Sequence, residues 1–135
     1  MENGTTVLAG GCFDTFHYGH LEYLTEAKKL GGILIVAMNS DRSFREYKKK
    51  EPLFCETQRA GILSHLDIVD YVFLFDEVTL DHGLERIKPN YYVKGIDYSL
   101  VNLPELSIVL RLDIEFRALG TKKFASSSQL SRLMT

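Results

Sequence analysis

The chain has 135 residues, a length that favours one domain with a single sizeable core. Hydrophobic residues make up 45% and charged residues 25%, a globular composition that excludes a disordered or fibrous chain. The net charge of −2 gives no overall field that attracts nucleic acid or an anionic membrane. We therefore expect any anionic ligand to be held by a local cluster of donors.

Cysteine usage and hydropathy favour the cytoplasm. Cys12 and Cys55 are too few for a disulfide scaffold, so we expect two reduced thiols. Residues 1–11 lack the basic start and long apolar run of a signal peptide. No stretch approaches the roughly 20 apolar residues that cross a bilayer. We expect a cytoplasmic protein with no membrane partner.

The first part of the chain predicts a strand, a loop, a helix and a second strand. The apolar run 6–9 ends at two glycines, which indicates a buried strand entering a loop. Apolar residues recur every three positions across 19–30, the spacing of an amphipathic helix that Gly31 ends. The β-branched run 33–38 is typical of a central parallel strand.

Strands and helices continue to alternate along the chain. We expect a polar, basic loop at 39–52. The other predicted strands are 71–75, 91–93 and 114–119. The other predicted helices are 56–66, with Thr57 as a cap, then 80–87, 103–110 and one opening at the serines 126–128. This order predicts one doubly wound, Rossmann-like domain over residues 1–135, with a five-stranded parallel sheet and helices on both faces.

Polar candidates for a site follow the predicted strands. They are the histidines at 17 and 20, the basic segment 39–50, the segment 94–98 and the serines 126–128. Ligands of doubly wound sheets bind beyond the carboxyl ends of the strands, near the point where strand order reverses. The sequence therefore predicts one site at that edge of the sheet.

The loop between the first strand and helix suits phosphate. The first N–H groups of a helix lack partners and carry positive partial charge, which favours an anion. Gly10 and Gly11 allow the backbone to approach it closely. His17 and His20 add two donors on one side, and their near-neutral pKa values allow both to be charged. A bare H-x-x-H fits a helix cap equally well, and two histidines alone leave a zinc site short of ligands.

The segment GCFDTFHYGH, residues 11–20, resembles the G-x-F-D-x-x-H-x-G-H signature of the cytidylyltransferase-like nucleotidyltransferase superfamily. The resemblance implies that His17 and His20 contact the phosphates of a nucleoside triphosphate and stabilise the pentavalent transition state. It also implies nucleotide contacts for Gly11, Cys12 and Phe13. Asp14 is a weak candidate for a metal ligand.

The resemblance continues from about residue 6 to residue 133. The segment REYKKKEP occupies the place of the family's lysine-bearing loop, and Lys48 best matches the lysine that reaches the triphosphate. Arg59, in ETQRAGILSHLDIVDYV, matches an arginine that binds nucleotide or organises the site. Asp70, at the end of the same segment, has a structural role in this interpretation.

The segment VKGIDY, residues 93–98, is closer to the Val-Lys-Gly-Gly-Asp-Tyr of heptose-1-phosphate adenylyltransferase domains than to the Gly-Asp-Asp-Trp of the glycerol-3-phosphate branch. The resemblance implies that Gly95 and Asp97 lie near the base and ribose. For Lys94 two interpretations stay open, a cation facing the acceptor substrate and a structural ion-pair partner.

Near the C-terminus, KKFASSSQL resembles the family's hydroxyl run that opens a phosphate-binding helix. Ser126, Ser127 and Ser128 match that run. Phe124 replaces the family's glycine, and Thr121 replaces the arginine of the glycerol-3-phosphate branch, whose charge Lys122 or Lys123 would supply.

These features together predict transfer of a nucleoside monophosphate from ATP or CTP to a phosphorylated small acceptor, with release of pyrophosphate and with Mg²⁺ accompanying the triphosphate. A sugar phosphate such as heptose 1-phosphate, for surface polysaccharide, is the favoured acceptor. Glycerol-3-phosphate or phosphoethanolamine cytidylyltransferase is an alternative, and a nucleotide-binding module without turnover is another. The resemblance also implies a homodimer.

Overall fold

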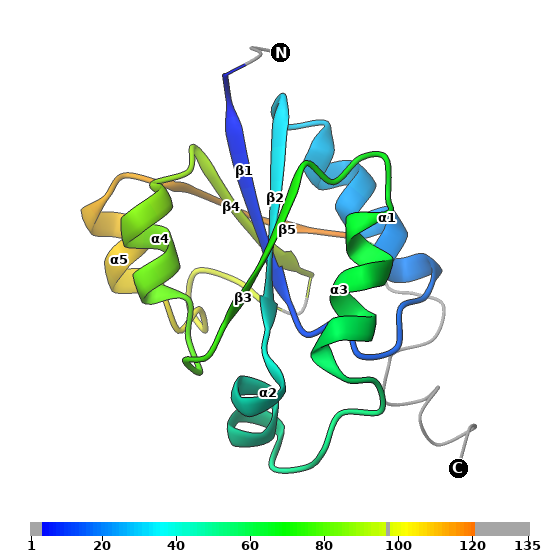
Figure 1. The fold of residues 1–135 in the computed structure, drawn as a ribbon. Helices are drawn as coiled ribbons and strands as arrows, with labels where there is room; N and C mark the ends of the chain where they lie inside the picture. Colours follow the sequence, from blue (N-terminus) through cyan, green and yellow to red (C-terminus); the bar gives the residue numbers. More distant parts are fainter. Residues whose placement is uncertain (1–3, 97, 121–135) are drawn as a thin grey trace.

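The computed structural model describes residues 4–96 and 98–120, and within them the chain forms one parallel sheet of five strands (Figure 1). The strands are β1 (Thr6–Gly11), β2 (Ile33–Asn39), β3 (Tyr71–Phe75), β4 (Tyr91–Gly95) and β5 (Glu115–Leu119). Their order across the sheet is β3-β2-β1-β4-β5, and every neighbouring pair is parallel. The predicted doubly wound parallel sheet is confirmed.

Helices cover both faces of the sheet. They are α1 (Tyr18–Lys28), α2 (Asp41–Lys48), α3 (Glu56–Ser64), α4 (Asp81–Ile87) and α5 (Leu106–Arg111). Figure 1 shows α1 and α3 on one face and α4 and α5 on the other, with α2 beyond the carboxyl ends of the strands. No helix among the described residues combines the length and apolar character needed to span a membrane. The helix expected from residue 126 lies outside the described residues.

Two apolar cores follow from the alternation of side chains along each strand. Val7 and Ala9 of β1 pack toward the α1 and α3 side, where Leu24 and Leu63 also lie fully buried. Leu8, between them in sequence, belongs to the core under α4 and α5. Burial of each valine or leucine side chain in these cores stabilises the fold by about 1.5–3 kcal/mol. A strand buried on both faces must be continuously apolar. This is why β1 and β2 could be recognised in the sequence as the apolar runs 6–9 and 33–38.

Helix α2 replaces the loop predicted at 39–52. Ser40 caps it, because its Oγ accepts a hydrogen bond from the N–H of Ser43 at 3.1 Å. Within α2 only Ser43 and Phe44 are buried, so the helix carries too few apolar residues to stand out in the sequence. The cap predicted for α3 was also wrong, since that helix begins at Glu56 and Thr57 is already inside its first turn. Helix α5 begins at Leu106, three residues later than predicted.

Strand order reverses between β1 and β4, and that is where ligands bind in folds of this type. Tyr23 of α1 links β1 and β4 at this point through hydrogen bonds. Its buried hydroxyl lies 3.1 Å from the carbonyl oxygen of Gly10 and 2.9 Å from that of Val93. Burial raises the pKa of Tyr23, so the hydroxyl keeps the proton that it donates to these carbonyls. The two strand ends are thereby held at a fixed separation.

Asp70 connects three segments at the opposite end of the sheet. Its Oδ2 accepts hydrogen bonds from the N–H of Leu34 at 2.8 Å and from Nζ of Lys28 at 2.7 Å. The same carboxylate therefore holds the start of β2 and the end of α1. This geometry agrees with the structural role expected from the sequence.

We expect Asp70→Ala to lower the free energy of unfolding by about 1–3 kcal/mol, because the buried N–H of Leu34 loses its acceptor. Urea denaturation measures this loss. The hydrogen bonds from Lys28 and Leu34 lower the pKa of Asp70, so its contribution is complete above the unfolded-state pKa and declines as pH falls. The difference in free energy of unfolding between Asp70→Ala and the parent protein should therefore become smaller at acidic pH. Asp67→Ala, at an exposed carboxylate, is the control, and an equal loss in both variants would contradict the assignment.

Candidate active site

The two histidines form a reciprocal cap at the start of α1. Nδ1 of His17 accepts a hydrogen bond from the N–H of Gly19 at 3.0 Å, and Nδ1 of His20 accepts one from the N–H of His17 at 3.2 Å. The rings stack with their centroids 4.0 Å apart. Because each Nδ1 is an acceptor, each neutral ring carries its proton on Nε2. Nε2 is therefore the atom that would donate to a phosphate oxygen.

Two glycines of the signature make room for aromatic rings. A Cβ on Gly19 would lie 2.8 Å from Cε1 of His17, so a larger residue would displace the capping ring. A Cβ on Gly11 would lie 2.8 Å from Cε2 of Phe13. Phe13 itself has a φ of 51°, a left-handed conformation that is unusual for a bulky residue. The structure thus explains Gly11 by the packing of Phe13, whereas the sequence suggested a close approach to an anion.

Aromatic side chains support His20. The Phe13 ring lies 5.3 Å from the His20 ring and the Phe16 ring lies 5.5 Å from it, centroid to centroid. Burial, with a smaller effect of neighbouring His17, lowers the pKa of His20 to about 4. His20 is therefore neutral at pH 7, and its pKa lies below the near-neutral value expected from the sequence. The buried Phe13 side chain supports the ring, which leaves only its backbone for a nucleotide contact.

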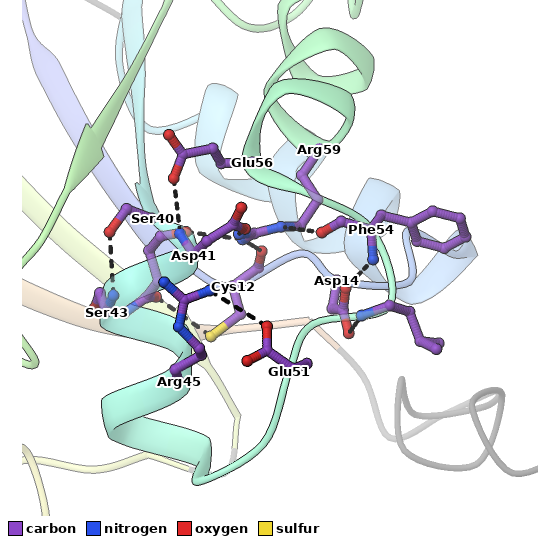
Figure 2. Close-up of polar contacts among 12 residues, drawn as sticks. Cys12, Asp14, Ser40, Asp41, Ser43, Arg45, Glu51, Phe54, Glu56 and Arg59 are labelled. Carbon is purple, nitrogen blue, oxygen red and sulfur yellow. Dashed lines mark hydrogen bonds and ion pairs between the residues drawn. The ribbon is translucent and has the colours of Figure 1, made fainter.

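Asp14 anchors the loop 49–55. Its Oδ2 accepts a hydrogen bond from the N–H of Leu53 at 2.9 Å, and its Oδ1 accepts one from the N–H of Phe54 at 3.0 Å (Figure 2). Both oxygens of this buried carboxylate are thus engaged with backbone. In the part of the chain that the structure describes, no group of three histidine, cysteine or acidic side chains is placed to hold a metal ion.

Arg59 is a buried connector, 1% exposed. Its Nη1 donates to the carbonyl oxygens of Cys12 and Asn39, both at 2.8 Å, and its Nε donates to that of Phe54 at 2.9 Å (Figure 2). Its Nη2 pairs with Oδ1 of Asp41 at 2.7 Å. The guanidinium therefore joins β1, β2, α2 and the loop before α3. Of the two roles that the resemblance implied for Arg59, nucleotide contact and organisation of the site, these contacts within the protein favour the second.

A chain of polar side chains links the ends of β1 and β2 to α2. Sγ of Cys12 donates to Oδ1 of Asn39 at 3.3 Å, and Nδ2 of Asn39 donates to Oγ of Ser43 at 2.8 Å. Burial raises the pKa of the Cys12 thiol, which keeps its proton for this bond. Cys12 and Cys55 are free thiols in the structure. The sequence placed Asn39 and Ser43 in the candidate segment 39–50 but gave neither residue a role of its own.

Two lysines flank the end of β1. Lys48 is the exposed last residue of α2, and Lys94 is half-buried in β4. The ammonium groups of both favour the thiolate form of Cys12, which shows that they lie near the carboxyl end of β1. A Cβ built on Gly95 would meet nothing within 4 Å, so space is open beside β4. Asp97, Ser126, Ser127 and Ser128 lie outside the described residues.

Comparison with known proteins agrees with this geometry. A family model described as Cytidylyltransferase-like matches residues 8–132, which is nearly the whole chain. The chain belongs to the cytidylyltransferase-like family. The resemblance drawn from residues 11–20 is thereby confirmed, and the histidine pair stands at the point of this nucleotidyltransferase fold where ligands bind.

Curated relatives of this cytidylyltransferase-like chain include proteins named Bifunctional protein HldE. The protein from Citrifermentans bemidjiense is 50% identical over 95 residues, which cover 70% of this chain and 20% of the relative. The protein from Campylobacter jejuni is 41% identical over 115 residues, covering 84% of this chain and 25% of the relative. The chain thus spans about a fifth to a quarter of the length of these relatives.

A solved structure has the same fold. The lipopolysaccharide core biosynthesis protein from Thermoplasma volcanium superposes with a TM-score of 0.75 at 28% sequence identity. The superposition covers 88% of this chain and 98% of that protein.

We expect the His20 ring to titrate with a midpoint of about 4 and to carry its proton on Nε2 at pH 7. Unfolded histidine binds a proton near pH 6.5, so the stability contributed by neutral His20 is complete above that pH and declines as pH falls toward 4. NMR spectra of the imidazole nitrogens measure both the midpoint and the tautomer. A midpoint near 6.5, or a proton on Nδ1, would contradict the reciprocal cap.

We expect Arg59→Met to lower the free energy of unfolding by about 3–5 kcal/mol, because Asp41 and three carbonyl groups lose their donor. Arg59→Lys keeps the positive charge but lacks the planar set of guanidinium N–H donors. We expect it to lower the free energy of unfolding by less than Arg59→Met does. Thermal melting measures both, with Arg42→Lys, at an exposed position of α2, as the control. Unchanged melting of Arg59→Lys combined with weaker nucleotide binding would overturn the structural assignment.

Proposed function

We propose that this domain transfers a nucleoside monophosphate from ATP or CTP to a sugar phosphate of the heptose kind, releasing pyrophosphate. The observation that carries the proposal is the stacked pair of His17 and His20 at the helix start beside the β1/β4 switch point. The acceptor is supported by the segment VKGIDY at 93–98, by the HldE relatives and by the lipopolysaccharide core biosynthesis protein.

The proposed reaction is a direct displacement at the α-phosphorus of the nucleotide. An oxygen of the acceptor phosphate attacks the α-phosphorus, a new P–O bond forms, and the bond from the α-phosphorus to the β-phosphate oxygen breaks. The electron pair of that bond leaves with pyrophosphate. No covalent enzyme intermediate is needed, since the acceptor is already an anionic nucleophile. The protein's contribution is therefore alignment and stabilisation of negative charge.

The histidines supply preset donors for that charge. Because Nδ1 of each ring is held by backbone, Nε2–H stays in place while charge builds up on the transferring phosphate. Neutral His20 donates without having to bind a proton first. Lys48, at the end of α2, is the proposed contact for the outer phosphates.

We propose that Mg²⁺ arrives bound to the triphosphate. Among residues 4–96 and 98–120 no acidic cluster is placed to hold the ion, and phosphate oxygens are ligands that magnesium prefers. When bound, the ion neutralises phosphate charge. A homodimer, implied by the family resemblance, stays a prediction that sedimentation equilibrium checks.

Pyrophosphate release tests the function. ATP and CTP are each combined with heptose 1-phosphate, glycerol 3-phosphate and phosphoethanolamine, with and without Mg²⁺. We expect release with heptose 1-phosphate in the presence of the ion. Release with another acceptor would replace the acceptor assignment, and tight nucleotide binding without release under any condition would favour a binding module.

We expect His17→Asn to lower turnover at least about tenfold, because asparagine can still cap α1 but lacks the Nε2–H donor. Steady-state kinetics measure the loss, and circular dichroism checks that the helix remains. His82→Asn, at an imidazole 79% exposed on α4, is the matched control and should keep parental turnover. Parental turnover in His17→Asn would refute the role of His17.

A further inference from the structure

Two tyrosines join across the end of β1. Tyr47 lies in α2, which follows β2, and Tyr98 lies in the segment that follows β4. Strands β2 and β4 are the two neighbours of β1, so these residues approach each other from opposite sides of the switch point. Their hydroxyl oxygens are 3.0 Å apart, a hydrogen bond between segments 51 residues apart in sequence.

Each tyrosine ring is covered by an ammonium group. Nζ of Lys94 lies 4.4 Å from the centroid of the Tyr98 ring, and Nζ of Lys48 lies 5.2 Å from that of the Tyr47 ring. Both distances are within the range of a cation–π contact. Each partner in the hydroxyl pair therefore has an ammonium group over its ring, that of Lys48 from α2 over Tyr47 and that of Lys94 from β4 over Tyr98.

The hydroxyl pair has hydrogen-bonding capacity left for a ligand. Two hydroxyls carry two protons, and their mutual bond uses one. Tyr47 is 44% exposed, so a ligand can reach the pair. Burial and the hydrogen bond to Tyr47 raise the pKa of Tyr98, so its hydroxyl stays protonated at neutral pH. The pair can thus donate to one ligand hydroxyl and accept from others.

We propose that Tyr47, Tyr98 and Lys94 form the acceptor subsite, and that this subsite selects a phosphate ester of a neutral polyol over an amino-alcohol phosphate. The ammonium of Lys94 binds the acceptor phosphate, and the paired hydroxyls bind the hydroxyl groups of the polyol. This inference rests on the proposed function and narrows its acceptor class.

The ammonium group of an amino-alcohol phosphate would lie near the positive charges of Lys48 and Lys94 at this subsite. A ligand ammonium is commonly held against the face of an aromatic ring. Both tyrosine rings already have a lysine ammonium over them, so a second cation would be repelled. Glu105, an acid that acts on Tyr98, is 4% exposed, and its oxygens accept hydrogen bonds from the N–H of Leu80 and the hydroxyl of Tyr92. It is therefore already engaged.

The test compares acceptors in three variants, Tyr47→Phe, Tyr98→Phe and Lys94→Met. We expect the parent to prefer heptose 1-phosphate over phosphoethanolamine at least tenfold in kcat/KM. Each phenylalanine variant should lower kcat/KM for heptose 1-phosphate about five- to tenfold, through the KM for that acceptor, while the KM for the nucleotide stays unchanged. Lys94→Met should reduce the preference itself. Tyr71→Phe, at a tyrosine 64% exposed on β3, is the control.

An equilibrium measurement separates this inference from the proposed function. Calorimetry with saturating α,β-methylene ATP or CTP measures binding of heptose 1-phosphate and phosphoethanolamine without turnover. Weaker sugar-phosphate binding by Tyr98→Phe supports the subsite even if the parent releases no pyrophosphate, a result that would refute the proposed function alone. Equal binding of the two acceptors by the parent, no sugar-phosphate binding, or equal affinities in the parent and Tyr98→Phe would overturn the subsite.

Discussion

Arg59 holds together the segments on which the site is built. One guanidinium, buried among backbone, binds carbonyl groups at the ends of β1 and β2 and the carbonyl of Phe54, and it pairs with Asp41 at the start of α2. A charge in that position is costly unless its nitrogens find acceptors, and here each of the three guanidinium nitrogens has at least one. Arg59 therefore sets how the histidine turn (residues 17–20) is placed relative to α2, the helix that carries Lys48.

The histidine turn combines folding and chemistry in the same atoms. One nitrogen of each ring completes the hydrogen bonding of the helix start, and that bond decides which nitrogen carries the proton. The side chains that would meet a phosphate are therefore oriented by the helix itself. Gly19 belongs to this arrangement because a side chain there would collide with His17.

Much of the fold could be predicted because the central strands are buried on both faces. The apolar run at 33–38 differs from β2 by one residue. The run at 71–75 coincides with β3, although that strand lies at the edge of the sheet and is only partly buried. Strands β1 and β4 run two residues further than predicted, into Gly11 and Gly95, because pairing with neighbours continues beyond the apolar residues. Helix α2 escaped prediction since its stability comes from the Ser40 cap and a few buried contacts.

The sequence indicated the position of site residues that belong to a recognisable motif. It could not indicate the role of residues whose role depends on burial in the folded chain. The spacing of His17 and His20 pointed to the phosphate end of the fold. Nothing in the sequence distinguishes a surface arginine from one buried between strand ends, so the sequence left both a nucleotide contact and a role in organising the site open for Arg59. The tyrosine pair was invisible for a similar reason, because Tyr47 and Tyr98 meet only when β2 and β4 take their places beside β1.

The loop 49–55 is fixed at its far end, where Asp14 holds the N–H groups of Leu53 and Phe54 while Arg59 holds the carbonyl of Phe54. Its near end is fixed differently, by the left-handed Lys49 that ends α2. Residues added between these two anchorages would bulge outward without shifting the histidine turn or α3. The scaffold can therefore tolerate length variation at 50–52 while the positions of His17 and His20 are preserved.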